Sequence, residues 1–148
     1  MKNKNVNISI CISVLNNKIK LEKCLQSIFN QTYKNFEVNI VDGASSDGSS
    51  KVINEYKNKI NNYISEKDNG IYEAFNKLID LSSGEFICFL GSDDYFIDNN
   101  SLLKLVTSCE TNNYDFISSQ ILLYDDKKIY NKKIGKKIIY SNLIYGMK

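Results

Sequence analysis

Short β-type runs alternate with helical apolar stripes along most of the chain. Residues 6–14 place Val or Ile at every second position, which is the period of a strand. Residues 21–29 then carry apolar side chains at the spacing of an amphipathic helix. The same patterns predict strands at 36–41, 63–65, 85–90 and 116–124, with helices around 50–56, 71–79 and 102–109. Strands joined by helix-length crossovers form a parallel sheet covered on both faces, so we predict an α/β fold with a mostly parallel, doubly wound sheet.

Two later stretches refine this prediction. Residues 86–90 read Phe-Ile-Cys-Phe-Leu, and such an unbroken apolar run predicts a strand buried on both faces. Residues 127–137 are rich in lysine and predict a hairpin, followed by a short final segment at 138–147. No linker or repeat divides the chain. We therefore expect a single domain over residues 1–148.

Several residue types that carry much of enzyme chemistry are absent. The chain has no His, no Trp and no Pro, and all 19 basic residues are lysines, against 17 acidic residues. Without His there is no Ser-His-Asp triad and no His-ligated zinc, and without Arg there is no bidentate phosphate clamp. The net charge of +2 argues against nucleic acid as a partner. Carboxylate, metal-ion, hydroxyl and backbone-amide chemistry remain.

The cysteines and the apolar runs bear on the cellular compartment. Cys11, Cys24, Cys88 and Cys109 form no Cys-x-x-Cys pair and lie in apolar stretches, which favours buried, reduced thiols. No run approaches the roughly 20 apolar residues that span a bilayer, and the first residues lack a signal-peptide core. We therefore expect a cytoplasmic protein.

Polar residues follow three of the predicted strands. Asn16 follows the first strand, Asp42 ends the second, and Asp93 and Asp94 follow the strand at 85–90. In a parallel sheet these ends share one edge, where ligands bind. Adjacent carboxylates in a crevice repel each other unless a cation is near, and an oxygen-only ligand set favours Mg²⁺ or Mn²⁺. The alternative is that Asp93 or Asp94 caps the next helix.

Known phosphate-binding sequence motifs are missing. No Gly-x-Gly-x-x-Gly follows the first strand, and no Gly-Lys-Ser/Thr occurs anywhere in the chain. A dinucleotide fold of the Rossmann type and a P-loop enzyme are therefore excluded.

Four segments, in order, closely resemble the family 2 glycosyltransferases, whose fold is the nucleotide-diphospho-sugar transferase (GT-A) fold. The segments are LEKCLQSIFNQTY at 21–33, DGASSDGS at 42–49, SEKDNGIYEAFNK at 65–77, and GEFI at 84–87 leading to SDD at 92–94. The resemblance covers residues 8–97. Four motifs at the family's order and spacing are far more specific than any one of them.

The resemblance implies a nucleotide-sugar site at the strand ends. Val14, Leu15 and Asn16 occupy the positions that line the base in this family. Asp42 would accept a hydrogen bond from the base, normally uracil or thymine. Asp68, in the loop before the third helix, would help to close the nucleotide pocket.

The same resemblance implies a divalent metal, Mn²⁺ or Mg²⁺, as cofactor. Ser92, Asp93 and Asp94 fill the family's DxD position, with Asp93 towards the ribose and also near the metal, and Asp94 on the metal. A cation that bridges both phosphates would neutralise the charge growing on the departing nucleoside diphosphate.

The activity implied is inverting transfer of a sugar from a UDP- or dTDP-sugar to a glycan or lipid-linked acceptor in bacterial surface polysaccharide synthesis. Such a role brings the protein to the inner face of the cell membrane as a peripheral protein. The family's general base and much of its acceptor site follow the position of Lys148, so we expect this chain to be the donor-binding part, truncated at its C-terminus. Apolar surface left by the truncation leads us to expect self-association.

Some motif residues have plainer interpretations. Gly43, Asp47 and Gly48 are expected to shape their loop and not to touch a ligand. Tyr72 and Phe75 are expected to pack in the core, and residues 125–126 to form a solvated turn.

Alternatives to an active transferase also stay open. Residues 13–15 replace the family's usual Pro or Thr and Tyr, so contact with the base must be weaker or differently made. One alternative is a nucleotide-binding module without transfer activity. Another is a nucleotidyltransferase of related fold, which the missing glycine-rich loop disfavours.

Overall fold

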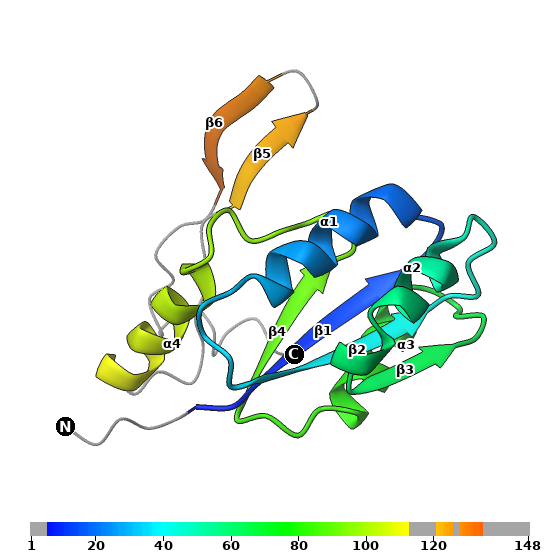
Figure 1. Ribbon diagram of the computed structural model, residues 1–148, viewed down its shortest axis with the longest axis horizontal. Coiled ribbons are helices and arrows are strands. Elements are labelled where there is room, and N and C mark those ends of the chain that lie inside the picture. Colours follow the sequence, from blue (N-terminus) through cyan, green and yellow to red (C-terminus); the bar gives the residue numbers. More distant parts are fainter. Residues whose placement is uncertain (1–5, 113–120, 126–127, 135–148) are drawn as a thin grey trace, which may run out of the picture.

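The computed structural model describes residues 6–112, 121–125 and 128–134. Its centre is a four-stranded sheet in the order β3-β2-β1-β4, in which every neighbouring pair is parallel (Figure 1). The strands are β1 (Ile8–Val14), β2 (Phe36–Asp42), β3 (Asn62–Ser65) and β4 (Phe86–Gly91).

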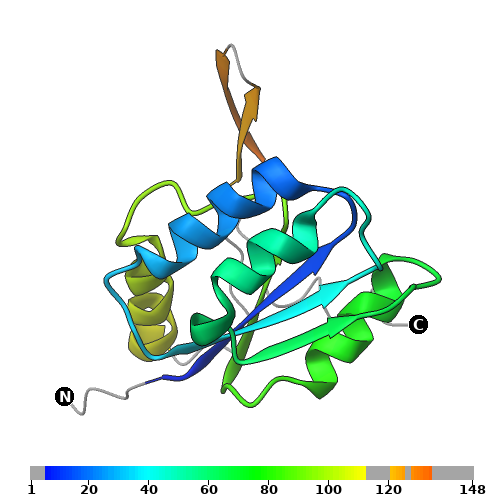
Figure 2. The ribbon, with the colours of Figure 1, turned by 45° about the vertical axis from the view of Figure 1, so that its right-hand side comes forward.

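Helices lie on both faces of this sheet, which confirms the predicted α/β architecture (Figure 2). Helices α1 and α2 pack on one face and α3 packs on the other. Their bounds, with those of the short helix η1, are α1 (Lys18–Phe29), α2 (Ser49–Glu55), η1 (Lys57–Lys59), α3 (Ile71–Asp80) and α4 (Ser101–Asn112). In the described part of the chain, no helix is both long and apolar enough to cross a membrane.

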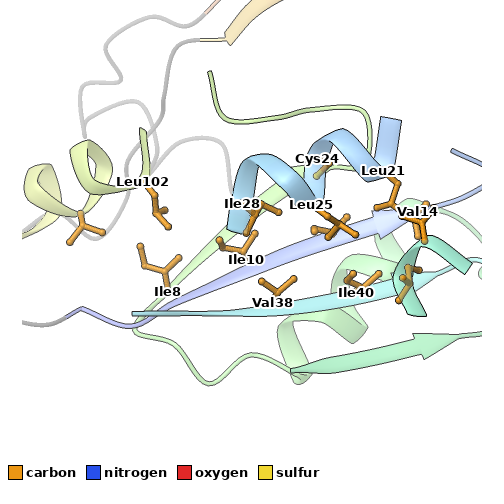
Figure 3. Packing of buried hydrophobic residues seen from close by; sticks show 14 of the residues in the cluster. Ile8, Ile10, Val14, Leu21, Cys24, Leu25, Ile28, Val38, Ile40 and Leu102 are labelled. Atoms are coloured by element: carbon orange, nitrogen blue, oxygen red, sulfur yellow. The ribbon is translucent and has the colours of Figure 1, made fainter. Parts of the chain in front are cut away.

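The larger core lies between the sheet and α1, α2 and α4. Its β1 members, such as Ile10 and Ile12, alternate along the strand and so point to one face. They meet the apolar stripe of α1, which Figure 3 shows lying along β1 above Val38 and Ile40 of β2. The spacing of α1 puts Leu21, Cys24, Leu25 and Ile28 on that one side of the helix, all buried.

A smaller core lies on the opposite face. Cys11 of β1 and Val41 of β2 point away from α1 and pack against Ala74 and Leu78 of α3. The strict alternation of β1 and β2 therefore fixes which helix each side chain meets, and α3 is anchored below the carboxyl ends of both strands.

The prediction that the strand at 85–90 is buried on both faces is wrong. Phe86, Cys88 and Leu90 pack against the larger core, but Ile87 is 38% and Phe89 43% exposed. In the described part of the chain, β4 is the last strand of its sheet, and α3 packs against β1 and β2. The opposite side of β4 is therefore covered only in part, with the ring of Phe75 4.6 Å from that of Phe89.

The strand predicted at 116–124 does not join the parallel sheet. The structure has β5 (Ile121–Asp125), which pairs antiparallel with β6 (Lys128–Ile134) as a separate hairpin, drawn in orange in Figure 1. The lysine-rich stretch is thus the second arm of a hairpin that begins earlier. Two residues between strands enforce antiparallel pairing, because a parallel partner needs a long crossover. The predicted segments at 116–120 and 138–147 lie outside the described residues.

Cysteine burial agrees with the prediction as far as the described side chains go. Cys11 and Cys24 are buried, Cys88 is half-buried, and all three are free thiols. Burial raises the pKa of Cys24 to about 12 and that of Cys88 to about 11, which keeps both protonated at neutral pH. The side chain of Cys109 lies outside the described residues.

Candidate functional site

The parallel register brings the four strand ends to one edge of the sheet. Val14 of β1 is level with Asp42 of β2, and Asp42 is level with Ser65 of β3. On the other side of β1, Ser13 is level with Gly91, the last residue of β4. Because β1 connects to β2 on one side and pairs with β4 on the other, the strand order reverses here, and such a reversal opens a crevice for ligands.

The loop after β1 exposes the apolar side chain of Leu15 and binds the neighbouring loop through the polar Asn16. Val14 is buried, whereas Leu15 is 63% exposed. Asn16 has a φ of 50° and accepts a hydrogen bond from the Ser46 backbone N–H at 2.8 Å, while its own N–H donates to Ser45 Oγ at 2.8 Å. The Asn16 side chain therefore holds the loop that follows β2.

Asp47 joins the starts of two helices, as the loop-shaping interpretation expects. Its carboxylate accepts hydrogen bonds from the Lys18 N–H at 2.8 Å and from the Ser49 N–H at 2.9 Å. The Ser49 hydroxyl, followed by the Lys18 N–H, lowers the pKa of Asp47. Gly48, at φ +96°, supplies the left-handed turn that precedes α2.

Asp42 is enclosed by its neighbours. It is 0% exposed, and both of its oxygens already accept hydrogen bonds within the protein. The Ser45 N–H donates to Oδ1 at 3.0 Å, and the Ser65 and Tyr63 hydroxyls donate to Oδ2 at 2.9 and 3.4 Å. Asp42 thus ties the ends of β2 and β3 to the loop that follows β2.

Asp68 lies in the loop between β3 and α3 and is held by a lysine. Its side chain is 9% exposed, and Lys77 Nζ lies 2.5 Å from its Oδ1. The same ammonium group lies 2.7 Å from Glu66 and 3.1 Å from Glu73, one helical turn before it. Asn69 donates from its backbone and its side chain to Glu73, and these bonds together with Lys77 lower the pKa of Glu73 to about 2.

One small area at the edge of the sheet is bordered by Leu15, Gly43 and Asp68. A Cβ added to Gly43 would lie 3.3 Å from Leu15 Cδ1 and 3.7 Å from Asp68 Oδ2. An apolar side chain, a residue without a side chain and a carboxylate oxygen therefore border the same small area. A flat ring could rest there with its face on Leu15 and its edge at Asp68.

The loop after β4 presents two carboxylates. A Cβ on Gly91 would lie 2.9 Å from Asp94 Oδ2 and 3.0 Å from Asp93 Oδ1, so both groups converge over Gly91. Burial first, and then the charge of Asp93, raise the pKa of Asp94. The preceding Ser92 is buried and accepts a hydrogen bond from Asn17 Nδ2 at 3.1 Å, which links this loop to the start of α1.

The helix-capping alternative for Asp93 and Asp94 is wrong. Helix α4 begins only at Ser101, and Asp98 accepts hydrogen bonds from the Asn100 N–H and the Ser101 hydroxyl at its start. Asp93 and Asp94 are instead exposed next to each other at the end of β4.

Asp93 and Asp94 fit a divalent cation whose other coordination positions are filled by water and substrate. Among residues 6–108, whose side chains the structure describes, no group of three or more His, Cys, Asp or Glu could enclose a metal ion. The two carboxylates that converge over Gly91 are hard oxygen ligands of the kind that Mg²⁺ and Mn²⁺ take. Mg²⁺ usually binds by one or two carboxylates, with waters and substrate phosphates completing its coordination.

Sequence reasoning missed one residue of this edge and misjudged another. Lys77 was not singled out, although Glu73 and Lys77 have the i, i+4 spacing that pairs charges on a helix. Tyr72 was expected in the core but is 80% exposed, because the stripe of α3 that faces the sheet is made by Ala74 and Leu78. Phe75 does pack against the smaller core, as expected.

Comparisons with known proteins agree with this geometry. The model of glycosyl transferase family 2 matches residues 9–145. A PGL/p-HBAD biosynthesis glycosyltransferase of Mycobacterium tuberculosis is 34% identical over 100 residues, which are 66% of this chain and 39% of that protein. The putative glycosyltransferase EpsH of Bacillus subtilis is 36% identical over 90 residues, 60% of this chain and 26% of that protein. The chain thus spans well under half the length of these relatives.

Solved structures of similar fold include two complexes with nucleotide sugars. TarS 1–349 of Staphylococcus aureus with UDP-GlcNAc superposes with a TM-score of 0.67 and 25% identity, over 72% of this chain and 32% of that one. The mannosyltransferase PcManGT of Pyrobaculum calidifontis, with GDP-Man and Mn²⁺, gives a TM-score of 0.64 and 21% identity, over 69% of this chain and 32% of that one. One of these structures is of a mannosyltransferase and the other holds UDP-GlcNAc, and the likeness to both confirms the predicted GT-A fold.

Proposed function

The chain belongs to glycosyl transferase family 2, a family of transferase enzymes, and from this premise we propose that its crevice binds a nucleotide-sugar donor. The observation that carries the proposal is the convergence of Asp93 and Asp94 over Gly91, at the edge where the strand order reverses. Two adjacent carboxylates at such an edge suit a cation that accompanies a diphosphate.

We propose a UDP- or dTDP-sugar as the donor. Support comes from TarS, which shares a quarter of its aligned residues with this chain and whose structure holds UDP-GlcNAc. The exposed Leu15 beside Gly43 offers an apolar seat of the kind a pyrimidine ring needs. Val14 and Asn16 support this seat from the end of β1, since Val14 packs in the core and Asn16 holds the loop of residues 43–48.

The proposed roles after β4 are those that the resemblance to the family implies for residues 92–94. Asp94, with Asp93, would hold Mn²⁺ or Mg²⁺, and Asp93 would also face the ribose. Ser92 would fix this loop against Asn17. When bound, the cation supplies neutralisation of the charge that develops on the departing nucleoside diphosphate. With no arginine in the chain, that charge has few other partners.

The wider activity is likewise a proposal. A sugar would be transferred with inversion to a glycan or lipid-linked acceptor in surface polysaccharide synthesis, by a protein that works in the cytoplasm and peripherally at the inner membrane face. Inversion needs a base that deprotonates the acceptor hydroxyl. We assign that base to no residue of the described part of the chain. Membership of a transferase family disfavours a purely nucleotide-binding module.

Calorimetric titration of UDP with and without Mn²⁺ tests the donor site. We expect metal-dependent binding that Asp94→Asn weakens at least tenfold, or about 1.4 kcal/mol. Asp80→Asn is the matched control, because Asp80 is an exposed carboxylate at the end of α3, and it should leave the affinity unchanged. A cooperatively folded sample that binds no UDP, or equal affinity in Asp94→Asn, would contradict the proposal.

Turnover of a labelled UDP-sugar separates the transferase from the two alternatives. Slow release of free sugar in the presence of Mn²⁺ supports transfer chemistry, with water as the acceptor. Binding without any release would favour the non-catalytic module, and pyrophosphate release from UTP and a sugar phosphate would favour a nucleotidyltransferase.

A further inference from the structure

Two carboxylates lie close to the proposed base pocket, and their surroundings differ. Asp42 ends β2, and Asp68 follows β3. Either could in principle read the edge of a nucleobase, because an ionised carboxylate accepts hydrogen bonds from ring N–H groups. Burial and hydrogen bonding decide between them.

Both carboxylate oxygens of Asp42 already accept hydrogen bonds from within the protein. The residue has no exposed surface, and the Ser45 N–H, the Ser65 hydroxyl and the Tyr63 hydroxyl occupy its two oxygens. A ligand atom could reach it only if these partners moved and left a buried charge less well paired, which is costly. Asp42 is therefore suited to hold three segments together.

The two oxygens of Asp68 have different surroundings: Oδ1 binds Lys77, and Oδ2 lies beside the proposed base pocket. No described residue donates a hydrogen bond to Oδ2, which lies 3.7 Å from the place of a Cβ on Gly43, beside Leu15. Because residue 43 is glycine, it places no side chain between this oxygen and Leu15. Asp68 thus carries a nine-tenths buried carboxylate with one oxygen left for a ligand.

Lys77 is fixed in the position from which it acts. Its neighbours on α3, Ala74 and Leu78, are buried against the sheet, so the helix cannot rotate without losing that packing. From this helix its ammonium group contacts Asp68, Glu66 and Glu73. Three carboxylates around one cation repel one another when the cation is removed, and the loop that carries Asp68 would then lose its position.

We infer, on the basis of the proposed donor site, that Lys77 is a positioning residue. By binding one oxygen of Asp68 it aims the other at the base, so that Asp68 rather than Asp42 accepts the imide N–H of uracil or thymine. Leu15 supports the face of the ring, and Gly43, which has no side chain, leaves space for the ring.

This arrangement selects between pyrimidines. Uracil presents an N–H at ring position 3, whereas cytosine presents a bare nitrogen acceptor there. A carboxylate acceptor favours uracil and repels the cytosine nitrogen. In Asp68→Asn, Lys77 would still bind the carbonyl oxygen and so turn the amide N–H₂ towards the base. That donor suits cytosine and not uracil.

Calorimetric titration of UDP and CDP, both with Mn²⁺, tests the inference. The unchanged chain should bind UDP at least tenfold more tightly than CDP. Asp68→Asn should lower the UDP-to-CDP preference at least tenfold. Lys77→Met should weaken UDP binding about five- to tenfold and reduce the same preference, because the loop is no longer held. Lys77→Arg keeps a cation that can pair with Asp68, and it should restore UDP affinity to within about threefold.

Asp42→Asn is the matched comparison. It should lower the melting temperature, since it disturbs a buried network, while the folded variant keeps its UDP-to-CDP preference. The inference is overturned if Asp68→Asn or Lys77→Met retains the UDP-to-CDP preference, or if Asp42→Asn abolishes it. Failure of the unchanged chain to bind UDP would instead overturn the proposed function, and this inference with it.

Discussion

Leu15 stands where the family that this chain resembles usually carries a tyrosine, and its side chain, directly after β1, is 63% exposed. An aliphatic side chain can support a base only by apolar contact, whereas an aromatic ring stacks on it. Base–aromatic stacking contributes about 1–3 kcal/mol. The geometry around Gly43 leaves Leu15 as the side chain next to the area where we place the base.

We therefore expect Leu15→Tyr to tighten UDP binding several-fold to about tenfold, with Leu15→Ala weakening it by a similar factor. Calorimetry at fixed Mn²⁺ measures both variants. Since Leu15 is exposed and outside both cores, its substitution should leave the unfolding midpoint unchanged. An alanine variant that binds UDP as well as the unchanged chain would contradict this role.

Glu37 is a second residue with an unusual environment, at the opposite end of the sheet from the site. Burial alone raises the pKa of its carboxyl, but hydrogen bonds from the Ser83 backbone, the Ser9 and Ser83 hydroxyls and Asn39 outweigh burial and lower the pKa to about 2. This carboxylate pins the turn before β4 to β1 and β2. Because its folded pKa lies below the ordinary 4.5, the stability it gives is complete above pH 4.5 and is lost as the pH falls towards 2.

Glu37→Gln should consequently lower the free energy of unfolding by about 2–3 kcal/mol at pH 7. The gap between the variant and the unchanged chain should shrink as the pH approaches 2, where the native carboxyl is protonated too. Urea denaturation at pH 7, 4 and 3 measures the gap. A difference in the free energy of unfolding that is the same at every pH would show that the loss of stability does not come from the charge of Glu37.

Helices and strands depend on a few buried polar contacts between them. Gln31, just after α1, is fully buried and connects that helix with the start of α4. Its Nε2 donates to the carbonyl oxygens of Ser27 and Asp98, and its Oε1 accepts from the Leu102 N–H at 2.9 Å. The Leu102 N–H is one of the first amides of α4, which have no partner within the helix.

Gln31→Leu keeps the volume but leaves these backbone groups unpaired, so we expect a loss of about 2–3 kcal/mol in the free energy of unfolding. Urea denaturation measures the loss, and Gln26→Leu on the exposed face of α1 is the control. UDP affinity should stay the same, because Gln31 lies at the far end of α1 from the site. An unchanged midpoint would mean that α4 is held by its apolar contacts alone.

Hydrophobic periodicity predicted the helices and strands correctly but did not predict which elements cover β4 or pair with β5. The helix stripe of α1 and the alternation of β1 are local patterns, and both were predicted with bounds close to those observed. Whether β4 is covered on its second side depends on how far α3 reaches across the sheet. Whether β5 pairs with the sheet or with β6 depends on the connection between them. Such facts concern distances between elements, which no window of sequence contains.

Across the described part of the chain, the site spans the ends of four strands, so ligand binding should be linked to global stability. A ligand that binds only the folded state at a hundred times its Kd adds about 2.7 kcal/mol. For a chain of this size that corresponds to a rise of about 5–10 °C in melting temperature.

We accordingly expect UDP and Mn²⁺ together to raise the melting temperature by that amount, and either one alone by much less. Thermal unfolding followed by circular dichroism measures the shift. Asp94→Asn should melt like the unchanged chain without ligand and should lose most of the shift. Equal shifts with UDP alone and with both would argue against a bridging cation.

The order of elements and the α/β class, together with the edge at which we propose the site, followed from the chain's own periodicities and from the polar residues at its strand ends. They could be predicted because a 3.6-residue or 2-residue period is a property of neighbours in sequence. The state of each carboxylate was settled only in three dimensions. Asp42 and Asp68 look alike as acidic residues near strand ends, yet one is closed in by Ser45, Tyr63 and Ser65, and the other keeps an oxygen beside Gly43. Burial and hydrogen bonding arise from segments far apart in the sequence, and only their packing decides which group a ligand can reach.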